Sequence, residues 1–384
     1  MPTNVTKPII LDETGRKIAG ALELIAEAQM ANIHELTNWY AVQQIVREGL
    51  GPDMLPVGSQ LKVPHETLGT LLFDVAGHDI YRSPFDSEAH TMVLLMHDCI
   101  NGRQADAAEA IYYAENGLAA GTYNFTLLPG WDVDYGGGGT YQFTLSQAVP
   151  EGGQLVFPWA YNTQAVNTKV SSYASASSAT AIESVSVISG SGGTSLGVAN
   201  GQSTNVNHGH RARYGSNHWG ESAIRQWLNS DAAANAWWHP TNKYDRPATY
   251  ANVAGFLNGI DAEFLAVVGA VDVTCRTNGT YELDHDLNTV YTTRDKFFLA
   301  SRVELGYGAE TSINEGSVWP LFDGAENVDR IKYDHALPST ARYWWLRSPY
   351  PGGAYFVRYV NPDGSLSSIT ALNGYGAAPA CVIY

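Results

Sequence analysis

The chain has 384 residues, of which 45% are hydrophobic and 11% aromatic, and it carries a formal net charge of −16. This length suffices for two or three domains with sizeable cores. The acidic balance argues against a phosphate-binding surface, because affinity for nucleic acid rests mainly on Lys and Arg, so we expect no nucleic-acid partner.

Targeting signals are not recognisable in the sequence. No apolar run reaches the roughly 18 residues that span a membrane, so we expect no membrane insertion. The first residues, MPTNVTKPIILDETGRK, lack the basic start and apolar centre of a signal peptide, which predicts synthesis in a cytoplasm. Cys99, Cys275 and Cys381 are far apart and form no CxxC motif. This usage is typical of reduced thiols, most of them buried.

Residues 12–48 have the apolar spacing of helices. The first part, GRKIAGALELIAEAQMANI, repeats Ile18, Leu22 and Ile25 at helical spacing. The second part gathers four apolar residues on one face, namely Trp39, Val42, Ile45 and Val46. Gly49 and then Pro52 end the pattern. We assign 1–54 as a helical N-terminal region that either oligomerises the chain or packs as a helical pair on the next domain.

From residue 55 the pattern changes to short strands. Runs such as LGTLLFDVAGHDIY and HTMVLLMHDCI are separated by turn clusters such as YGGGGT and PEGG. Regular short strands with such punctuation predict an all-β, sandwich-like domain over 55–162. Residues 163–205 are rich in Ser, Ala and Gly and hold one alternating piece, AIESVSVIS. We interpret 163–205 as a strand and linker.

Residues 206–384 form a predicted α+β domain with few helices, a small sheet and an aromatic-rich core. One helical stripe consists of Trp219, Ala223, Ile224, Trp227 and Leu228. Ser216 or Asn217 is the predicted N-cap of this helix. Strand-like runs follow, among them DKFFLASRVEL, YWWLRSP, AYFVRYV and PACVIY.

Motifs that carry chemistry are weak throughout. His208 and His210 have the spacing of a metal-binding pair on a strand, but no third ligand is near, and 282–287 lack the glycine of a calcium loop. The segment VNPDGS reads as a β-turn with Pro362 second and Gly364 fourth. Motifs of serine hydrolases and zinc proteases are absent from the sequence, so we expect no enzyme, no metal and no cofactor.

The stretch 354–376, AYFVRYVNPDGSLSSITALNGYG, places Tyr355, Phe356, Tyr359 and Tyr375 among Gly, Ser and Asn. This mixture is typical of antibody paratopes, because tyrosine gives rigid contact area and small polar residues give adaptable hydrogen bonds. The alternative is a terminal hairpin whose aromatics pack inward. Alternation predicts Tyr355, Val357 and Tyr359 on one face, and Phe356, Arg358 and Val360 on the other.

Three segments stand out together: RYGSNHWGESAIRQWLNS, DKFFLASRVELGYG and the frame ARYWWLRSP…VRYVNPDGS…GAAPACVI. They resemble the variable proteins of diversity-generating retroelements in phages of gut bacteria. The resemblance covers about residues 206–384. It implies a C-type-lectin-like domain related to the formylglycine-generating-enzyme branch and to phage tropism determinants. For the N-terminal half it implies only an accessory region of phage proteins.

In this family, error-prone reverse transcription mutates adenines of a template repeat, and the product replaces the variable repeat at the 3′ end of the gene. Template AAY codons become NNY codons, which never encode Lys, Glu, Gln, Trp or Met. Residues 346–384 lack these same five residue types, although all five occur elsewhere in the chain.

The resemblance also implies which positions vary within a variable region at about 344–384. Fixed positions would be 344–349, 357–358, 360–366 and 378–382. We expect the ten positions between them to form the ligand-binding face: Tyr350, Tyr355, Phe356, Tyr359, Ser367, Ser368, Ile369, Thr370, Leu372 and Tyr375. Gly353 and Ala354 are further candidates.

The function implied is a diversified, hypervariable surface on a phage receptor-binding or adhesion protein that sets host tropism. Its partners would be a host-cell surface receptor, protein or glycan, and other virion proteins. A homo-oligomer is implied, with a trimer favoured. The implied location is a tail fibre or another exposed surface of the virion, after synthesis in the bacterial cytoplasm.

Two motifs of related lectin-like proteins are absent, which narrows the range of expected functions. The chain has neither a Glu-Pro-Asn nor a Gln-Pro-Asp motif of calcium-dependent sugar binding, and it lacks the paired active-site cysteines of the formylglycine-generating relatives.

Two alternative functions stay open. One is a structural virion protein whose hairpin belongs to the core, and the other is an enzyme on the same fold, with a cleft of perturbed titratable groups or a metal.

Overall fold

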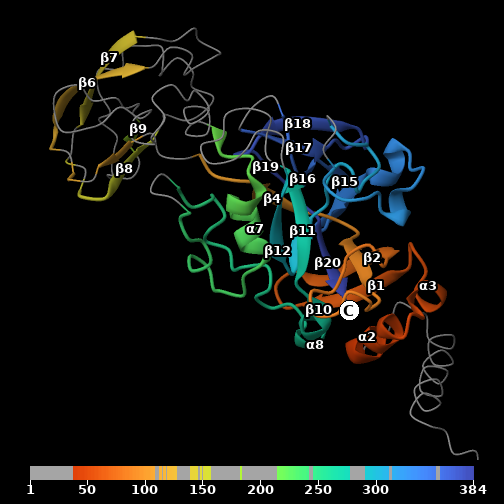
Figure 1. The fold of residues 1–384 in the computed structure, drawn as a ribbon. Helices are drawn as coiled ribbons and strands as arrows, with labels where there is room; N and C mark the ends of the chain where they lie inside the picture. The colour runs from red at the N-terminus through yellow and green to blue at the C-terminus, as the bar shows by residue number, and fades with distance from the viewer. Residues whose placement is uncertain are drawn as a thin grey trace, which may run out of the picture.

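The computed structural model describes residues 38–108, 214–241, 245–276, 290–310, 314–351 and 355–384, together with short stretches between 112 and 183. In these residues, a few short helices accompany many antiparallel strands that form curled sheets (Figure 1). The predicted mixed class, mostly β with few helices, is therefore confirmed at that level. No helix in the described ranges combines the length and the apolar character needed to cross a membrane.

The helical elements are short. They are α2 (Trp39–Arg47), α3 (Gly51–Met54), α7 (Ala223–Leu228), α8 (Ala262–Val267) and the 3-10 turns η3 (Trp219–Glu221), η4 (Pro320–Phe322) and η5 (Asn327–Arg330). Helix α2 begins where the Asn38 side chain accepts a hydrogen bond from the amide of Ala41 at 3.1 Å. The predicted apolar stripe of this helix is buried, which confirms its pattern. The predicted helix over 12–37 lies outside the described residues.

The predicted N-cap of the helix after residue 216 is wrong by several residues. Trp219–Glu221 forms a separate 3-10 turn, and Ser222 then adopts an extended backbone with ψ of 144°. The Ser222 hydroxyl accepts a hydrogen bond from the amide of Arg225, so Ser222 caps α7. The 3-10 turn stays apart from α7 because the Trp219 indole donates to Asp295 at 3.1 Å, which fixes the turn against β12.

One sheet joins strands from opposite ends of the chain. Its strand order is β1 (Gln60–His65), β2 (Gly69–His78), β3 (Met92–Met96), β20 (Pro379–Ile383) and β10 (Val268–Gly269), and β13 (Phe297–Leu299) also pairs with β20. Strands β3 and β20 are buried along their whole length, in keeping with their apolar sequences MVLLM and PACVI. The β-rich region predicted over 55–162 thus contributes β1–β3 to the sheet of the C-terminal strands rather than to a sandwich of its own.

A second sheet carries the predicted variable region. Its order is β18 (Leu366–Thr370), β17 (Phe356–Val360), β16 (Trp344–Pro349), β19 (Gly374–Ala377) and β4 (Ile100–Gln104). Two hairpins complete the main body: β11 (Val271–Arg276) with β12 (Val290–Asp295), and β14 (Lys332–Asp334) with β15 (Leu337–Arg342). The remaining described strands are β5 (Tyr112–Ala114), β6 (Gly121–Leu127), β7 (Gly139–Leu145), β8 (Gly153–Val156) and β9 (Ile182–Glu183).

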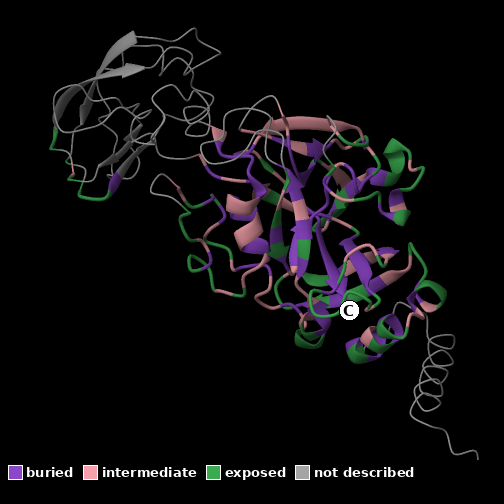
Figure 2. Cartoon of the chain, viewed as in Figure 1, coloured by how far each residue is buried: buried purple, intermediate pink, exposed green. Residues whose placement is uncertain are grey.

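The core is a single cluster of buried side chains that runs from α2 to β20 (Figure 2). Phe264 of α8 packs on Trp39 with ring centroids 4.6 Å apart, on Phe73 at 5.7 Å and on Phe297 at 6.3 Å. Aromatic pairs of this kind each contribute about 0.5–1.5 kcal/mol beyond the area they bury. Elements far apart in sequence are therefore held in one core.

The predicted turn over 361–364 connects β17 to β18, as expected. The amide of Gly364 donates to the carbonyl of Asn361 at 2.8 Å, which is the bond of a four-residue turn. Gly364 has φ of +79°, and a Cβ atom there would lie 1.7 Å from the backbone oxygen of Asn327 in η5. The Tyr307 hydroxyl donates to the carbonyl of Gly364. The turn therefore packs closely against η5 of the same chain, and position 364 requires glycine.

We expect Gly364→Ala to lower the free energy of unfolding by at least about 2 kcal/mol, because it combines backbone strain with a clash against η5. Gly374→Ala is the matched control. A Cβ at Gly374 would meet its nearest atom at 3.6 Å, an ordinary contact, so this variant should stay within about 1 kcal/mol of the wild type. Urea unfolding measures both, and equal losses in the two variants would contradict the seating of the turn.

A histidine–carboxylate pair links β2 to the turn after β3. His97 Nδ1 lies 2.8 Å from Asp74 Oδ2, and the Lys332 ammonium donates to the carbonyls of Met96 and His97. The hydrogen bond to Asp74 raises the pKa of His97 above its ordinary value, although burial and Lys332 oppose the shift. Protonated His97 therefore stabilises the folded state.

We expect His97→Asn to reduce stability most at pH below about 6.5, the ordinary pKa of histidine. A group with a raised folded-state pKa contributes fully below its unfolded-state pKa, and the contribution is lost as pH rises through the folded-state value. Urea unfolding of both proteins between about pH 5 and pH 8 measures the difference. The control is His239→Asn at an exposed site. A stability difference that is constant with pH would disprove the role of the pair.

Candidate functional site

The predicted variable positions gather on and around the β17–β18 hairpin. Strand β18 is at the edge of its sheet and, among the described strands, pairs only with β17 (Figure 1). All five residues of β18 are partly exposed. The register places Phe356 opposite Thr370, and Tyr359 opposite Ser367. Six of the ten predicted positions therefore lie on two adjacent strands.

These six positions lie on both faces of the hairpin. Residues opposite each other on paired strands share a face, and the face alternates along each strand. Tyr359 therefore shares a face with Ser367 and Ile369, and Phe356 shares the other face with Ser368 and Thr370. The alternation predicted for β17 is the one observed, but the positions do not form a single flat face.

One face carries a group of four rings, Tyr343, Trp345, Tyr359 and Tyr375, which we call the Trp345 cluster. Tyr375 stacks on Trp345 at a centroid distance of 4.8 Å and on Tyr343 at 4.9 Å, and its edge contact with Tyr359 is also 4.9 Å. Tyr359 is only 8% exposed, Tyr375 is partly exposed, and Tyr343 is 41% exposed. The cluster is therefore anchored in the core through Trp345 and reaches the surface at Tyr343.

A second group of rings, the Phe356 cluster, consists of Tyr214, Tyr350, Tyr355 and Phe356. Tyr355 lies 4.3 Å from Phe356 and stacks on Tyr214 at 5.0 Å, and Tyr350 contacts the edge of Phe356 at 6.0 Å. All four residues are partly exposed. The tenth predicted position, Leu372, is 9% exposed, and its amide donates to the Tyr214 carbonyl at 3.1 Å. The Phe356 cluster thus brings together three predicted positions and one residue outside the predicted set.

Arg358, a predicted fixed position, is held between the Phe356 cluster and an acidic partner. Its guanidinium lies 4.7 Å from the centre of the Tyr350 ring. Its Nε donates to Glu310 at 3.0 Å, and Arg302 contacts the same carboxylate at 2.5 Å. Arg302 and Glu310 cannot be assigned to this site from the sequence, because their distance from Arg358 along the chain leaves no local pattern.

Beside β17, strand β16 carries Arg347, which forms a buried ion pair with Glu304 from the segment that follows β13. Arg347 Nη1 lies 2.6 Å from Glu304 Oε2, Nη2 lies 2.7 Å from Oε1, and the side chains are 0% and 1% exposed. The other three N–H groups of Arg347 donate to the carbonyls of Thr274, Leu299 and Glu315. All five donors of the guanidinium are thus satisfied, as a buried charge requires.

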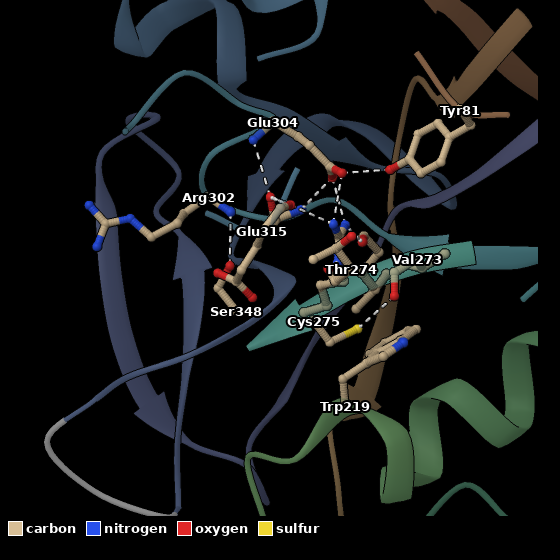
Figure 3. Close-up of polar contacts among 12 residues, drawn as sticks. Tyr81, Trp219, Val273, Thr274, Cys275, Arg302, Glu304, Glu315 and Ser348 are labelled. Atoms are coloured by element: carbon tan, nitrogen blue, oxygen red, sulfur yellow. Dashed lines mark hydrogen bonds and ion pairs between the residues drawn. The ribbon is translucent and has the colours of Figure 1, made fainter. Parts of the chain in front are cut away.

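The Glu304 carboxylate is also fully engaged, as Figure 3 shows for its contact with Tyr81. It accepts the Tyr81 hydroxyl at 2.5 Å and the Ser301 amide at 2.8 Å. Burial and the nearby carboxylate raise the pKa of Tyr81, so its hydroxyl stays protonated and donates. Burial likewise raises the pKa of Glu315, although Arg347 opposes the shift. Arg347 and Glu304 thus already have their partners, which favours a rigid arrangement around them.

The three cysteines are free and buried, which confirms their predicted state. Burial raises the pKa of Cys99 and that of Cys275 to about 12. Both thiols therefore stay protonated at neutral pH and are poor nucleophiles. Within the described ranges, no three His, Cys, Asp or Glu side chains are grouped to hold a metal ion. His208, His210 and 282–287 lie outside those ranges.

We expect Arg347→Met to lower the free energy of unfolding by about 3–5 kcal/mol, because it leaves the Glu304 charge buried without its partner. The double variant Arg347→Met, Glu304→Gln has no uncompensated charge and should regain part of this stability. Urea unfolding of the three proteins measures the effect. A double variant no more stable than Arg347→Met would contradict the charge argument.

Comparison with protein families gives one match, which spans all ten predicted positions. A family model described as Domain of unknown function (DUF6273) matches residues 182–384, more than half of the chain. Neither the curated proteins nor the solved structures gave a match.

Proposed function

The chain belongs to the DUF6273 family, and we propose that it is a diversified ligand-binding protein, the variable protein of a diversity-generating retroelement. In this proposal, residues 206–384 form a C-type-lectin-like domain, and the β17–β18 hairpin and its two aromatic clusters contact the ligand. The protein binds and does not catalyse.

The observation that carries the proposal is how burial divides between the predicted fixed and variable positions. The fixed segments 344–349 and 378–382 are buried throughout, whereas in the fixed segments 357–358 and 360–366 only Val357, Val360 and Gly364 are buried. Eight of the ten variable positions are partly exposed, and the exceptions are Tyr359 and Leu372. Substitution at a surface position usually changes stability by less than about 0.5 kcal/mol, whereas a core change costs several times more. The eight positions can therefore vary while the fold is kept.

Rigidity of the support favours the same function. The hairpin is fixed at its turn by Gly364 and Tyr307, and beside it by the Arg347–Glu304 ion pair. A preorganised surface loses little conformational entropy on binding, so more of the contact energy appears as affinity. The partly exposed rings of the Phe356 cluster and the Ser and Thr residues of β18 supply the contacts that paratopes use.

The biological setting follows from the family resemblance alone. The ligand would be a receptor on a host cell, protein or glycan, and the protein would be displayed on a phage particle, in a tail fibre or another exposed part of the virion. Assembly into a homo-oligomer, with a trimer favoured, would multiply weak single contacts.

A second function is supported by a specific observation. Tyr359 and Tyr375 pack on Trp345, which is what a structural virion protein with an ordinary core hairpin would show. On this alternative, the partly exposed positions have no ligand, and their identities are fixed as in any other surface.

Sequencing of the gene from many isolates separates the two functions. If the surface is diversified, substitutions concentrate at the eight partly exposed positions, while residues 214–349 of the same gene serve as the internal control. A reverse transcriptase gene nearby and a near-copy of the 3′ segment with AAY codons are expected as well. Substitutions scattered evenly over 214–384 would reject the proposal in favour of the structural alternative.

A further inference from the structure

A cavity of about 360 Å³ lies away from the hairpin, and none of the ten predicted positions lines it. Residues 80–84 form one wall, Asp272 and Thr274 of β11 form another, and Gly316 and Ser317 complete it beside Glu304. Figure 3 shows Tyr81, Thr274 and Glu304 around the same region. The volume falls at the lower end of the range of about 300–1,000 Å³ that is typical of small-molecule sites.

Two opposite charges in the cavity wall have no partner among the described residues. Arg82 and Asp272 are exposed, and neither side chain forms an ion pair or hydrogen bond in the described part of the chain. The register of β11 and β12 places Arg294 opposite Asp272, but the Arg294 guanidinium lies over the Phe85 ring at 5.6 Å. The cavity therefore presents one available cation and one available anion.

The buried charge beside the cavity does not compete for a ligand. Glu304 is neutralised by Arg347, and both its oxygens already accept hydrogen bonds. Gly316 leaves this part of the wall without a side chain, since a Cβ there would lie 2.7 Å from Glu304 Oε1. Arg82 and Asp272 alone therefore decide the charge of a molecule that the cavity accepts.

The rest of the wall is suited to a small organic body. Thr274 and Ser317 offer hydroxyl groups that hydrogen-bond no described residue, and Ile80 and Pro84 offer apolar surface. A ligand that satisfies all these groups carries a carboxylate for Arg82, an ammonium group for Asp272 and a short side chain between them. We propose that this cavity binds a free α-amino acid. The ligand-contacting groups of this cavity are separate from the ten hairpin positions.

Isothermal titration calorimetry of the full chain with each standard L-amino acid tests the proposal. At least one should bind, and its N-acetyl and carboxamide derivatives should bind about tenfold more weakly, because each has lost one charge-assisted contact. Arg82→Gln should weaken the amino acid about tenfold but leave its carboxamide unaffected. Asp272→Asn should weaken the amino acid about tenfold but leave its N-acetyl derivative unaffected.

Two further variants serve as controls. Ser317→Tyr fills the entrance from an exposed position, so it should abolish binding without changing the melting temperature. Lys62→Gln removes an exposed charge elsewhere and should bind as the wild type does. The proposal is overturned if no L-amino acid binds the wild type, if the blocked derivatives bind equally well, or if folded Ser317→Tyr retains affinity.

Discussion

The Arg347–Glu304 ion pair is the interaction on which the rest of the C-terminal structure depends. Arg347 comes from the central strand β16, and three of its five donors tie that strand to β11, to β13 and to the segment that contains Glu315. Glu304 extends the same network to Tyr81, in the segment after β2. Removing two charges from water is unfavourable unless every polar atom is paired, so the surrounding backbone can adopt only the arrangement that completes the set.

The two aromatic clusters differ in how deeply they are buried. The Trp345 cluster is continuous with the core, and its Tyr359 is nearly buried. The Phe356 cluster lies at the surface, where Arg358 fixes Tyr350 through a cation–π contact. A ligand on this surface would thus meet rings whose backbone is fixed, while their identities contribute little to the stability of the fold.

Local patterns in the sequence predicted local structure well. The stripe of α2, the turn at 361–364 and the alternation along β17 follow from spacing and turn chemistry alone. The pairing of β3 with β20 and the contact of Arg347 with Glu304 join residues far apart in the chain, which spacing does not encode. The cavity lined by Arg82 and Asp272 cannot be predicted from the sequence for the same reason, since its walls come from separate segments.

The pairing of β20 with β3 has a consequence for how the gene can change. Strand β20 is translated after the hairpin, yet it sits between β3 and β10 and also pairs with β13. If the hairpin codons are rewritten as proposed, a frameshift in that step would remove β20 and leave β3 as an open apolar edge, a state prone to aggregate. Out-of-frame copies would therefore fail to fold, and only proteins with in-frame substitutions would present a folded hairpin.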